Sequence, residues 1–330
     1  MNLTNRPRRL RRTDEVRRLC RETRLSSDSL IYPIFIDQTL SGVRPIESLP
    51  GQNHYGLDSV TQAVEECLSH GVNHCMLFGL PSYKDACGSS AWAEDGVVQQ
   101  AVRAIKAAYP DFHVITDVCM CEYTDHGHCG ILCGHEVDND KTLEVLSRTA
   151  LSHVKAGADM VAPSDMMDGR IGVIREALDK EGFIHARIMA YSAKYASAFY
   201  GPFRDAVGSA ANLGRSNKAV YQMDPANSDE ALWEVGLDLE EGADMVMVKP
   251  GLPYLDVLRR VKDEFKAPTY AYHVSGEYAL LKAAAAAGYI DEKKFTMETM
   301  MCFKRAGADG ILTYCALDVA RWLKEEPVSL

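Results

Sequence analysis

The sequence predicts an α/β fold in which eight strand–helix units close into a barrel, and three observations support this prediction. Short apolar runs alternate with amphipathic segments almost to the C-terminus. The runs are nearly continuous in apolar residues, as expected of parallel strands that are buried on both faces. Eight runs can be counted, which is the number in a (β/α)8 or TIM barrel. The alternation alone also fits a Rossmann-like sheet, so the count decides for the barrel.

The predicted strands are six to eight residues long, and helical patterns separate them. The strands are expected at 30–37, 75–80, 113–120, 160–165, 187–193, 244–249, 268–274 and 310–315. The helices are expected at 58–70, 96–108, 141–155, 172–180, 229–240, 254–265 and 278–287.

A Gly-Ala-Asp triplet recurs at 157–159, 242–244 and 307–309, each time between a predicted helix and a predicted strand. Glycine is expected to close the helix, and the strand to begin two residues later. Three copies are too few to establish a repeat, but the spacing agrees with regular strand–helix units.

Composition and charge are those of an ordinary globular protein, with 47% hydrophobic and 25% charged residues. The net charge of −10 argues against nucleic acid as a general partner. No apolar run approaches the roughly 20 residues that span a bilayer, and the start lacks the apolar stretch of a signal peptide. We therefore expect a cytoplasmic protein with no membrane partner. Its ten cysteines suit metal binding better than disulfides.

Residues 1–28 are predicted to form an N-terminal arm that precedes the catalytic barrel at 29–330. Nine arginines and no lysine lie between Arg6 and Arg24. Such an arm can bind nucleic acid, or it can pair with carboxylates of a neighbouring subunit. Three acidic residues interrupt the charge, and no aromatic residue is interleaved for base stacking. These features favour an arm that mediates oligomerisation.

Reactive side chains occupy the carboxyl ends of the predicted strands, where a barrel of this kind places its active site. A random set of strand ends would consist mostly of turn formers. The set here is Asp37, Asp117, Cys119, Ser164, Asp165, Lys194, Lys249, Ser275 and Tyr314.

Two lysines, Lys194 and Lys249, stand out among these ends. A lysine at the exit of an apolar strand is poorly hydrated, which favours the neutral amine and makes it a nucleophile toward carbonyl carbon. Two such lysines suggest two carbonyl substrates. The alternative is that both ammonium groups extend along apolar surface to reach solvent.

A cysteine-rich loop follows the third predicted strand. The spacing of Cys119, Cys121 and Cys129 brings three thiols together if the loop folds back, and thiolate is a preferred ligand of zinc. Three protein ligands leave one position open for water or substrate, as in catalytic zinc sites. Cys133 or either of two nearby histidines can instead complete a closed structural site. The position at a strand end favours the catalytic alternative.

A long segment at 199–221, rich in small and polar residues, is predicted to cover the barrel mouth as a lid. It carries Arg204, Arg215 and Lys218, which are placed to bind an anionic substrate group such as a carboxylate. Taken singly, each of them is more simply explained as a solvated surface charge. With two amines beneath such a lid, a keto acid is the expected substrate.

Motifs in one order along the chain carry a resemblance that covers essentially its full length. They are RPRRLR at 6–11, DVCMCEYTDHGHCG at 117–130, APSDMMDGR at 162–170, SAK at 192–194, YGPFRDA at 200–206, YQMDP at 221–225, MVKPG at 247–251, YHVSGEY at 272–278 and TYCA at 313–316. The chain resembles the porphobilinogen synthase (5-aminolevulinate dehydratase) family. The resemblance implies a (β/α)8 barrel whose arm embraces a neighbour, usually in an octamer. It also implies condensation of two 5-aminolevulinate molecules to porphobilinogen with loss of two waters, an early step of heme biosynthesis.

The resemblance assigns roles to individual residues. Lys249 resembles the lysine that forms a Schiff base with the first substrate, and Lys194 the lysine that binds the second. Each ammonium group is expected to lower the pKa of the other. Cys119, Cys121 and Cys129 match the zinc ligands, and Asp117 is the candidate for proton transfer. Ser275 and Tyr314 resemble the groups that bind the carboxylate of the first substrate. Arg204 and Lys218 resemble those that bind the carboxylate of the second, and Gln222 is expected to contribute to the lid contacts.

Three further positions bear on additional metal sites or on the charge near the zinc ligands. Val220 stands where some relatives have a cysteine that helps to form a second metal site, so no such site is predicted. Glu234 resembles a carboxylate that holds an allosteric magnesium, with Arg170 of the adjacent subunit nearby, although a glutamate on a helix is usually solvated. Asp125 adds a negative charge close to the zinc ligands, and no role is assigned to it.

Two other functions fit part of the pattern. A class I aldolase on the same barrel needs one Schiff-base lysine and no zinc, so the cysteine loop argues against it. A zinc-stabilised protein that binds nucleic acid through its arginine arm needs no reactive lysine.

Overall fold

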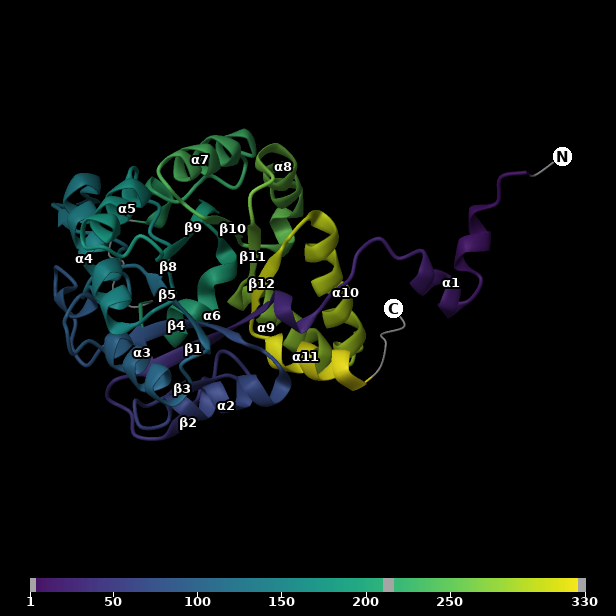
Figure 1. Cartoon of the computed structure of the whole chain (residues 1–330), viewed down its shortest axis with the longest axis horizontal. Helices are drawn as coiled ribbons and strands as arrows, with labels where there is room; N and C mark the ends of the chain where they lie inside the picture. The colour runs from purple at the N-terminus through teal and green to yellow at the C-terminus, as the bar shows by residue number, and fades with distance from the viewer. Residues whose placement is uncertain (1–3, 210–216, 326–330) are drawn as a thin grey trace.

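The computed structural model describes residues 4–209 and 217–325, and its centre is a closed barrel of eight parallel strands (Figure 1). Neighbouring strands follow one another along the chain, and pairing of Leu30 with Ile311 closes the ring. The predicted (β/α)8 barrel is confirmed. Its strands are β1 Leu30–Asp37, β4 His74–Leu80, β5 His113–Val118, β8 Met160–Pro163, β9 Arg187–Lys194, β10 Met245–Lys249, β11 Thr269–His273 and β12 Gly310–Thr313.

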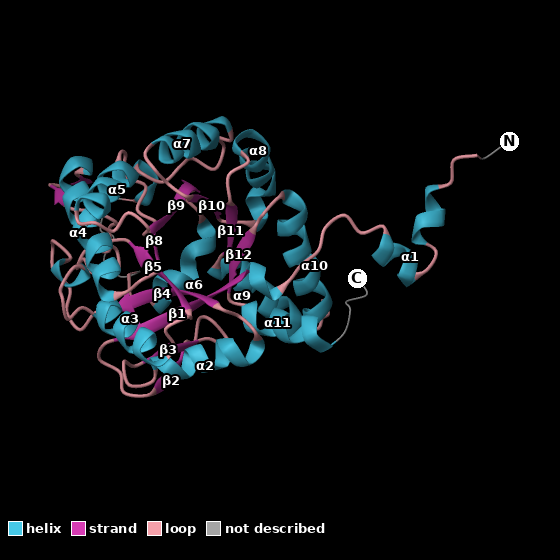
Figure 2. Ribbon diagram, viewed as in Figure 1, coloured by secondary structure: helices cyan, strands magenta, loops and turns pink. Residues whose placement is uncertain are grey.

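Helices surround the strands on the outside of the barrel (Figure 2). All seven predicted helical segments contain a helix, and α10 and α11, which the sequence analysis did not single out, complete the ring near the C-terminus. The helices around the barrel are α2 Val60–His70, α3 Val97–Ala108, α4 Asn139–Ala156, α5 Arg170–Lys180, α7 Asp229–Glu240, α8 Leu255–Phe265, α9 Ser275–Ala286, α10 Glu292–Ala306 and α11 Ala316–Glu325.

The core lies inside the barrel and between the barrel and its helices. Every residue of β1 is buried, as expected of a strand covered on both faces. Helix α3 shows how each helix contributes, because Ala101, Val102 and Ile105 are fully buried, whereas Arg103 on the other side is exposed. This one-sided burial follows from the amphipathic pattern.

Short extra elements elaborate the loops at the carboxyl ends of the strands. After β1, strand β2 Val43–Pro45 pairs antiparallel with β3 Asn53–Tyr55, which lies beside β1. After β5, β6 Leu132–Cys133 pairs with β7 Glu136–Val137. After β9, the short helix α6 Gly201–Ala206 lies in the predicted lid. The elaborations therefore gather at the end of the barrel where the reactive residues were predicted.

The N-terminal residues extend away from the barrel (Figure 1). They form a 3-10 helix, Pro7–Arg11, and α1 Asp14–Leu19, and neither contains a buried residue. Residues 1–3 of the predicted arm lie outside the described residues. In the described part of the chain, no helix combines the length and apolar character needed to cross a membrane.

The Gly-Ala-Asp triplet has a structural explanation. Gly157 and Gly307 close α4 and α10 with a φ of +110°, a backbone conformation that favours glycine. The aspartate of each triplet then accepts a hydrogen bond from the start of the neighbouring strand, as Asp159 does from Val114 N–H at 2.8 Å and Asp309 from Thr269 N–H at 2.7 Å. Each strand begins three residues after the glycine, at residues 160 and 310 as the predicted ranges have it and one residue later than the two-residue spacing expected from the triplet.

Candidate active site

The carboxyl ends of four neighbouring strands bring the reactive residues together. Lys194 and Lys249 are the last residues of β9 and β10, and their Cα atoms are partners in the parallel register. Asp117 lies near the end of β5, and Ser164 follows β8. Four of the predicted strands end earlier than expected, at Val118, Pro163, His273 and Thr313, so Cys119, Asp165 and Tyr314 belong to the segments that follow. The residues still converge on one barrel mouth.

Lys249 lies in an aromatic enclosure. Its Nζ atom is 4.5 Å from the ring centroid of Tyr272, 5.0 Å from Phe203, 5.1 Å from Tyr191 and 5.3 Å from Tyr200. The residue is only 5% exposed. Its ammonium group does not reach solvent, so the interpretation as a solvated lysine at a strand tip does not hold.

The electrostatics of this enclosure favour a neutral amine on Lys249. Burial lowers the pKa of Lys249 to about 7, and the positive charge of Lys194 acts in the same direction. Asp117 opposes both effects. The mutual repulsion expected between the two lysines is therefore confirmed for Lys249, and a substantial fraction of the amine is unprotonated at neutral pH.

Lys194 is equally buried but has polar neighbours. Its Nζ donates a hydrogen bond to the carbonyl oxygen of Ser164. Burial lowers the pKa of Lys194, but the nearby thiols of Cys129, Cys119 and Cys121 outweigh this effect and raise it. The pKa of Lys194 is therefore raised overall, and any depression by the Lys249 ammonium group is outweighed by the thiol cluster, with Cys129 acting most strongly.

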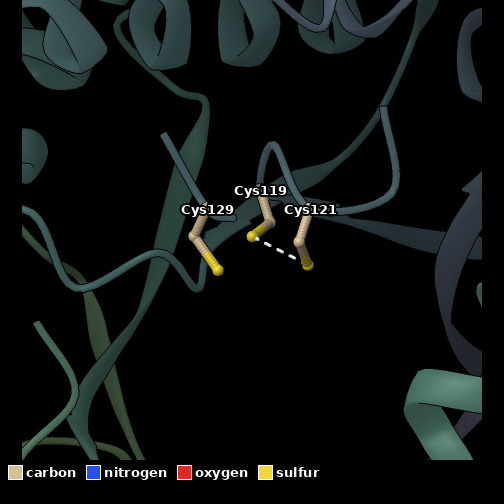
Figure 3. A group of neighbouring side chains, drawn as sticks. All are labelled: Cys119, Cys121 and Cys129. Atoms are coloured by element: carbon tan, nitrogen blue, oxygen red, sulfur yellow. Dashed lines mark hydrogen bonds between the residues drawn. The ribbon is translucent and has the colours of Figure 1, made fainter. Parts of the chain in front are cut away.

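Three buried thiols form a cluster in the loop after β5 (Figure 3), and their charge acts on Lys194. The sulfur atoms of Cys119, Cys121 and Cys129 all lie within 4.8 Å of one another, and those of Cys119 and Cys121 are 3.4 Å apart. Tetrahedral zinc with bonds of about 2.3 Å separates its sulfur ligands by roughly 3.8 Å, so the cluster fits such an ion. Cys133 is exposed and, like the two histidines, is in no metal-binding group among the described residues.

The three thiols differ in the direction of their pKa shifts. Hydrogen bonds from Cys119 and Cys121 hold the pKa of Cys129 well below its usual value, and the ammonium group of Lys218 acts in the same direction. Burial raises the pKa of Cys119 well above its usual value. A divalent cation would favour deprotonation of all three thiols.

Asp117 is a buried carboxyl group close to both the lysines and the thiols. Its pKa is raised to about 7, because burial and the charge of Glu122 raise it more than Lys249 and Lys194 lower it. Its Oδ1 atom has no hydrogen-bond partner in residues 4–209 and 217–325. A carboxyl group with such a pKa can both accept and donate a proton near neutral pH.

The structure describes the two ends of the predicted lid. Residues 210–216, and with them Arg215, lie outside the described residues. Arg204 is half-buried on α6. Lys218 is 8% exposed, and its Nζ lies 3.4 Å from the sulfur of Cys129. The structure thus places Lys218 over the thiols rather than on the surface.

Gln222 is buried just after Lys218, and its Oε1 atom lacks a hydrogen-bond partner among the described residues. The preceding residue, Tyr221, contacts the cysteine loop through its hydroxyl group, which accepts a hydrogen bond from Cys129 N–H at 3.3 Å and lies 3.2 Å from His128 Nδ1. The end of the predicted lid is therefore joined to the thiol cluster.

Ser275 and Tyr314 lie on the other side of Lys249. The Tyr314 hydroxyl is 3.0 Å from that of Tyr272, one of the rings over Lys249. The Ser275 hydroxyl accepts a hydrogen bond from Phe203 N–H at 3.0 Å and donates one to the Phe199 carbonyl at 3.2 Å. In this structure Ser275 is thus engaged with the segment that carries Arg204, and a substrate carboxylate would have to displace a backbone contact to bind it.

Glu234 lies apart from these residues, on α7. It lines a cavity of about 530 Å³ that also contains Asp168 and Glu230. Burial raises its pKa to about 7 against the positive charge of Arg170 of the same chain. That arginine is 2% exposed and pairs with Asp238 at 3.0 Å. Neither metal-binding group found in the described residues includes Glu234.

The sequence analysis missed several features of the site. Glu122 forms a second possible metal-binding group with Asp117 and Cys119 and contacts the sulfur of Cys121 at 3.3 Å. Its position within the cysteine motif was the available signal. The aromatic enclosure had no such signal, because its rings come from three separate parts of the sequence.

Comparison with known proteins identifies the chain's relatives. Residues 4–322 match the family model described as delta-aminolevulinic acid dehydratase. The delta-aminolevulinic acid dehydratase of Halalkalibacterium halodurans is 52% identical over 321 residues, which cover 97% of each chain. That of Bacillus subtilis is 50% identical over 321 residues, or 97% of this chain and 98% of the relative.

A solved structure agrees with these relatives. The delta-aminolevulinic acid dehydratase (porphobilinogen synthase) of Toxoplasma gondii ME49, in complex with its reaction product porphobilinogen, superimposes with a TM-score of 0.95 at 46% sequence identity. The match covers 98% of this chain and 92% of the other.

Proposed function

The chain belongs to the delta-aminolevulinic acid dehydratase family and makes porphobilinogen, a step of tetrapyrrole biosynthesis, and we propose that Lys249 and Lys194 bind its two 5-aminolevulinate substrates. The observation that carries this proposal is the pairing of the two lysines at adjacent strand ends beside three thiols. Two amines in register can hold two ketones close enough to be joined.

Lys249 is proposed to capture the first substrate. Its neutral amine attacks the ketone carbon, the resulting carbinolamine loses water, and an imine forms. Tyr272, Phe203 and the other rings exclude water from this imine. Ser275 and Tyr314 are proposed to bind the carboxylate of this substrate.

Lys194 is proposed to hold the second substrate as an imine, with its carboxylate bound by Arg204 and Lys218 and with Gln222 in contact. The raised pKa of Lys194 means that its ammonium group must lose a proton before it can attack a ketone. Loss of a proton next to one imine then gives the enamine that forms the carbon–carbon bond. Two waters leave in all when two substrates condense.

Asp117 is the proposed proton carrier. Its carboxyl group lies close enough to both lysines for their charges to lower its pKa, and it titrates near neutrality. It is therefore able to take a proton from Lys194 or from a substrate carbon and return it later.

Cys119, Cys121 and Cys129 are proposed to hold a zinc ion, because three buried thiols suit this metal and leave a ligand position open. When bound, the ion would supply a Lewis acid for a substrate oxygen or nitrogen. The family is metal-dependent, and zinc is our assignment of the ion.

Glu234 is proposed to contribute to an allosteric magnesium site in the cavity at α7. We also propose that residues 1–28 form an oligomerisation arm, that 29–330 form the catalytic barrel with a lid at about 199–221, and that the cytoplasmic protein is an octamer of arm-embracing dimers. The absence of buried residues in the described arm supports this organisation, since its apolar side chains need a partner.

Borohydride reduction in the presence of 5-aminolevulinate tests the proposal directly. Reduction of an imine leaves a stable adduct, and peptide mapping should locate it at Lys249 and Lys194. A protein that makes porphobilinogen but carries no adduct at either lysine would exclude the proposed roles. An adduct at Lys249 alone, with no requirement for metal, would support the aldolase-like alternative.

A further inference from the structure

Glu277 is a buried carboxylate that the proposed chemistry does not use. It is the third residue of α9 and is only 6% exposed. Its Oε1 accepts a hydrogen bond from Leu252 N–H at 2.6 Å, and its Oε2 accepts one from Val274 N–H at 2.5 Å. One side chain therefore joins the loop that follows Lys249 to the residue that precedes Ser275.

The loop after Lys249 has little freedom to move away from this contact. A Cβ atom on Gly251 would lie 2.5 Å from the Phe303 ring and 2.8 Å from the Tyr272 carbonyl oxygen, so the backbone packs there as closely as glycine permits. On the other side of the loop, the Lys249 carbonyl accepts a hydrogen bond from Tyr195 N–H at 2.9 Å.

The contact geometry requires two acceptor oxygens, which a carboxyl group supplies. Both oxygens of Glu277 accept hydrogen bonds from backbone N–H groups, and the third position of a helix is where its dipole favours negative charge. Burial raises the pKa of Glu277 to about 8, while the bonds from Val274, Leu252 and Gly251 oppose this increase. Glutamine cannot reproduce the arrangement, because its amide nitrogen would face an N–H donor.

We propose that Glu277 is a positioning residue that fixes the separation between the Lys249 amine and the start of α9, and so selects the length of the first keto acid. This inference rests on the proposed roles of Lys249 and Ser275. In 5-aminolevulinate, two methylene groups separate the ketone carbon from the carboxylate. The ketone must reach Lys249 while the carboxylate reaches Ser275, so a shift of either loop loses one contact.

Borohydride trapping of two probe ketones at Lys249 separates this role from a general structural one. The first probe is 4-oxopentanoate, which has the substrate skeleton and its carboxylate, and the second is propanone, which has no carboxylate. Glu277→Gln should lower trapping of 4-oxopentanoate at subsaturating concentration by roughly tenfold. Trapping of propanone needs only the amine and should stay within about twofold.

Two further variants complete the test. Glu241→Gln is a matched control, because the Glu241 carboxylate also accepts a helix N-terminal hydrogen bond, from Gly172 N–H at 3.1 Å; both probes should react with it as with the wild type. Glu277→Asp retains a carboxyl group with two acceptor oxygens and should trap more 4-oxopentanoate than Glu277→Gln. If the glutamine variant does not fold, Glu277→Asp carries the test, with a severalfold fall in the ratio of the two probes expected.

The outcomes are distinguishable. An unchanged ratio of the two probes in a folded Glu277 variant, whether both stay high or both fall, overturns the positioning role. Failure of the wild-type protein to trap either probe at Lys249 instead overturns the proposed function on which the inference rests.

Discussion

Lys194 and Lys249 hold equivalent positions on neighbouring strands but lie in opposite surroundings. Lys249 faces four aromatic rings, and burial lowers its pKa to about 7. Lys194 faces a backbone carbonyl and the thiol cluster, and its pKa is raised. The difference shows that a residue's place in a barrel strand does not set its reactivity. The side chains around the strand end do so, through the charge or the aromatic surface that they bring from neighbouring strands, such as Tyr272 of β11, and from the loops that cover them.

Replacing each lysine by arginine is expected to have the largest effect on activity. Arginine keeps the positive charge but cannot form an imine, so Lys249→Arg and Lys194→Arg should each lower porphobilinogen formation by at least about 10³-fold, as removal of a covalent nucleophile does. The variants should differ in trapping. Lys194→Arg should still form the 4-oxopentanoate adduct at Lys249, and Lys249→Arg should not, as peptide mapping after borohydride reduction would reveal.

Loss of the Lys249 adduct in folded Lys194→Arg would mean that the two sites are not separable. Far-ultraviolet circular dichroism serves as the control that the barrel is intact.

Removal of metal should lower porphobilinogen formation but should leave trapping at Lys249 largely unchanged. A chelator should lower porphobilinogen formation by at least about 10²-fold, because a Lewis acid contributes several kcal/mol, and added zinc should restore it. Trapping of 4-oxopentanoate at Lys249 should change little, since aromatic rings rather than thiols surround that amine. Full activity in verified metal-free protein would instead assign the three cysteines a structural role.

The pH dependence of trapping tests whether the charge of Lys194 lowers the pKa of Lys249. With a pKa of about 7, the neutral fraction of Lys249 rises about tenfold between pH 6 and pH 8. Lys194→Met removes a like charge, raises the pKa of Lys249 and should move the trapping curve to higher pH. The surface variant Lys293→Met is the matched control and should leave the curve in place. A curve unmoved by Lys194→Met would show that the lysines are electrostatically independent.

The smallest expected effect concerns a single hydroxyl group in the aromatic enclosure. Tyr272→Phe keeps the ring 4.5 Å from Lys249 but removes the hydroxyl that contacts Tyr314. Trapping of propanone should be unchanged, whereas KM for 5-aminolevulinate should rise by about fivefold or less, because one neutral hydrogen bond contributes roughly 1 kcal/mol. A larger effect on propanone than on 5-aminolevulinate would assign the hydroxyl to the amine rather than to the carboxylate site.

Much of the fold and the site could be predicted because local patterns encode them. Continuous apolar runs predicted the eight strands, and the Gly-Ala-Asp triplets marked strand starts to within one residue. The spacing of Cys119, Cys121 and Cys129 predicted a cluster that the structure forms. Less could be predicted where distant segments meet. Ser275 looked like an open ligand for a carboxylate, yet its hydroxyl contacts the backbone of Phe199 and Phe203.

The sequence alone located the strand ends to within two residues, because alternation and strand length depend on neighbouring residues. It therefore placed Lys194, Lys249 and the thiols at one mouth. Only the tertiary structure decided that Lys249 is enclosed by rings, that thiols raise the pKa of Lys194, and that Glu277 joins two loops. Burial and charge act through space over a few ångströms, and the groups that exert them are far apart along the chain.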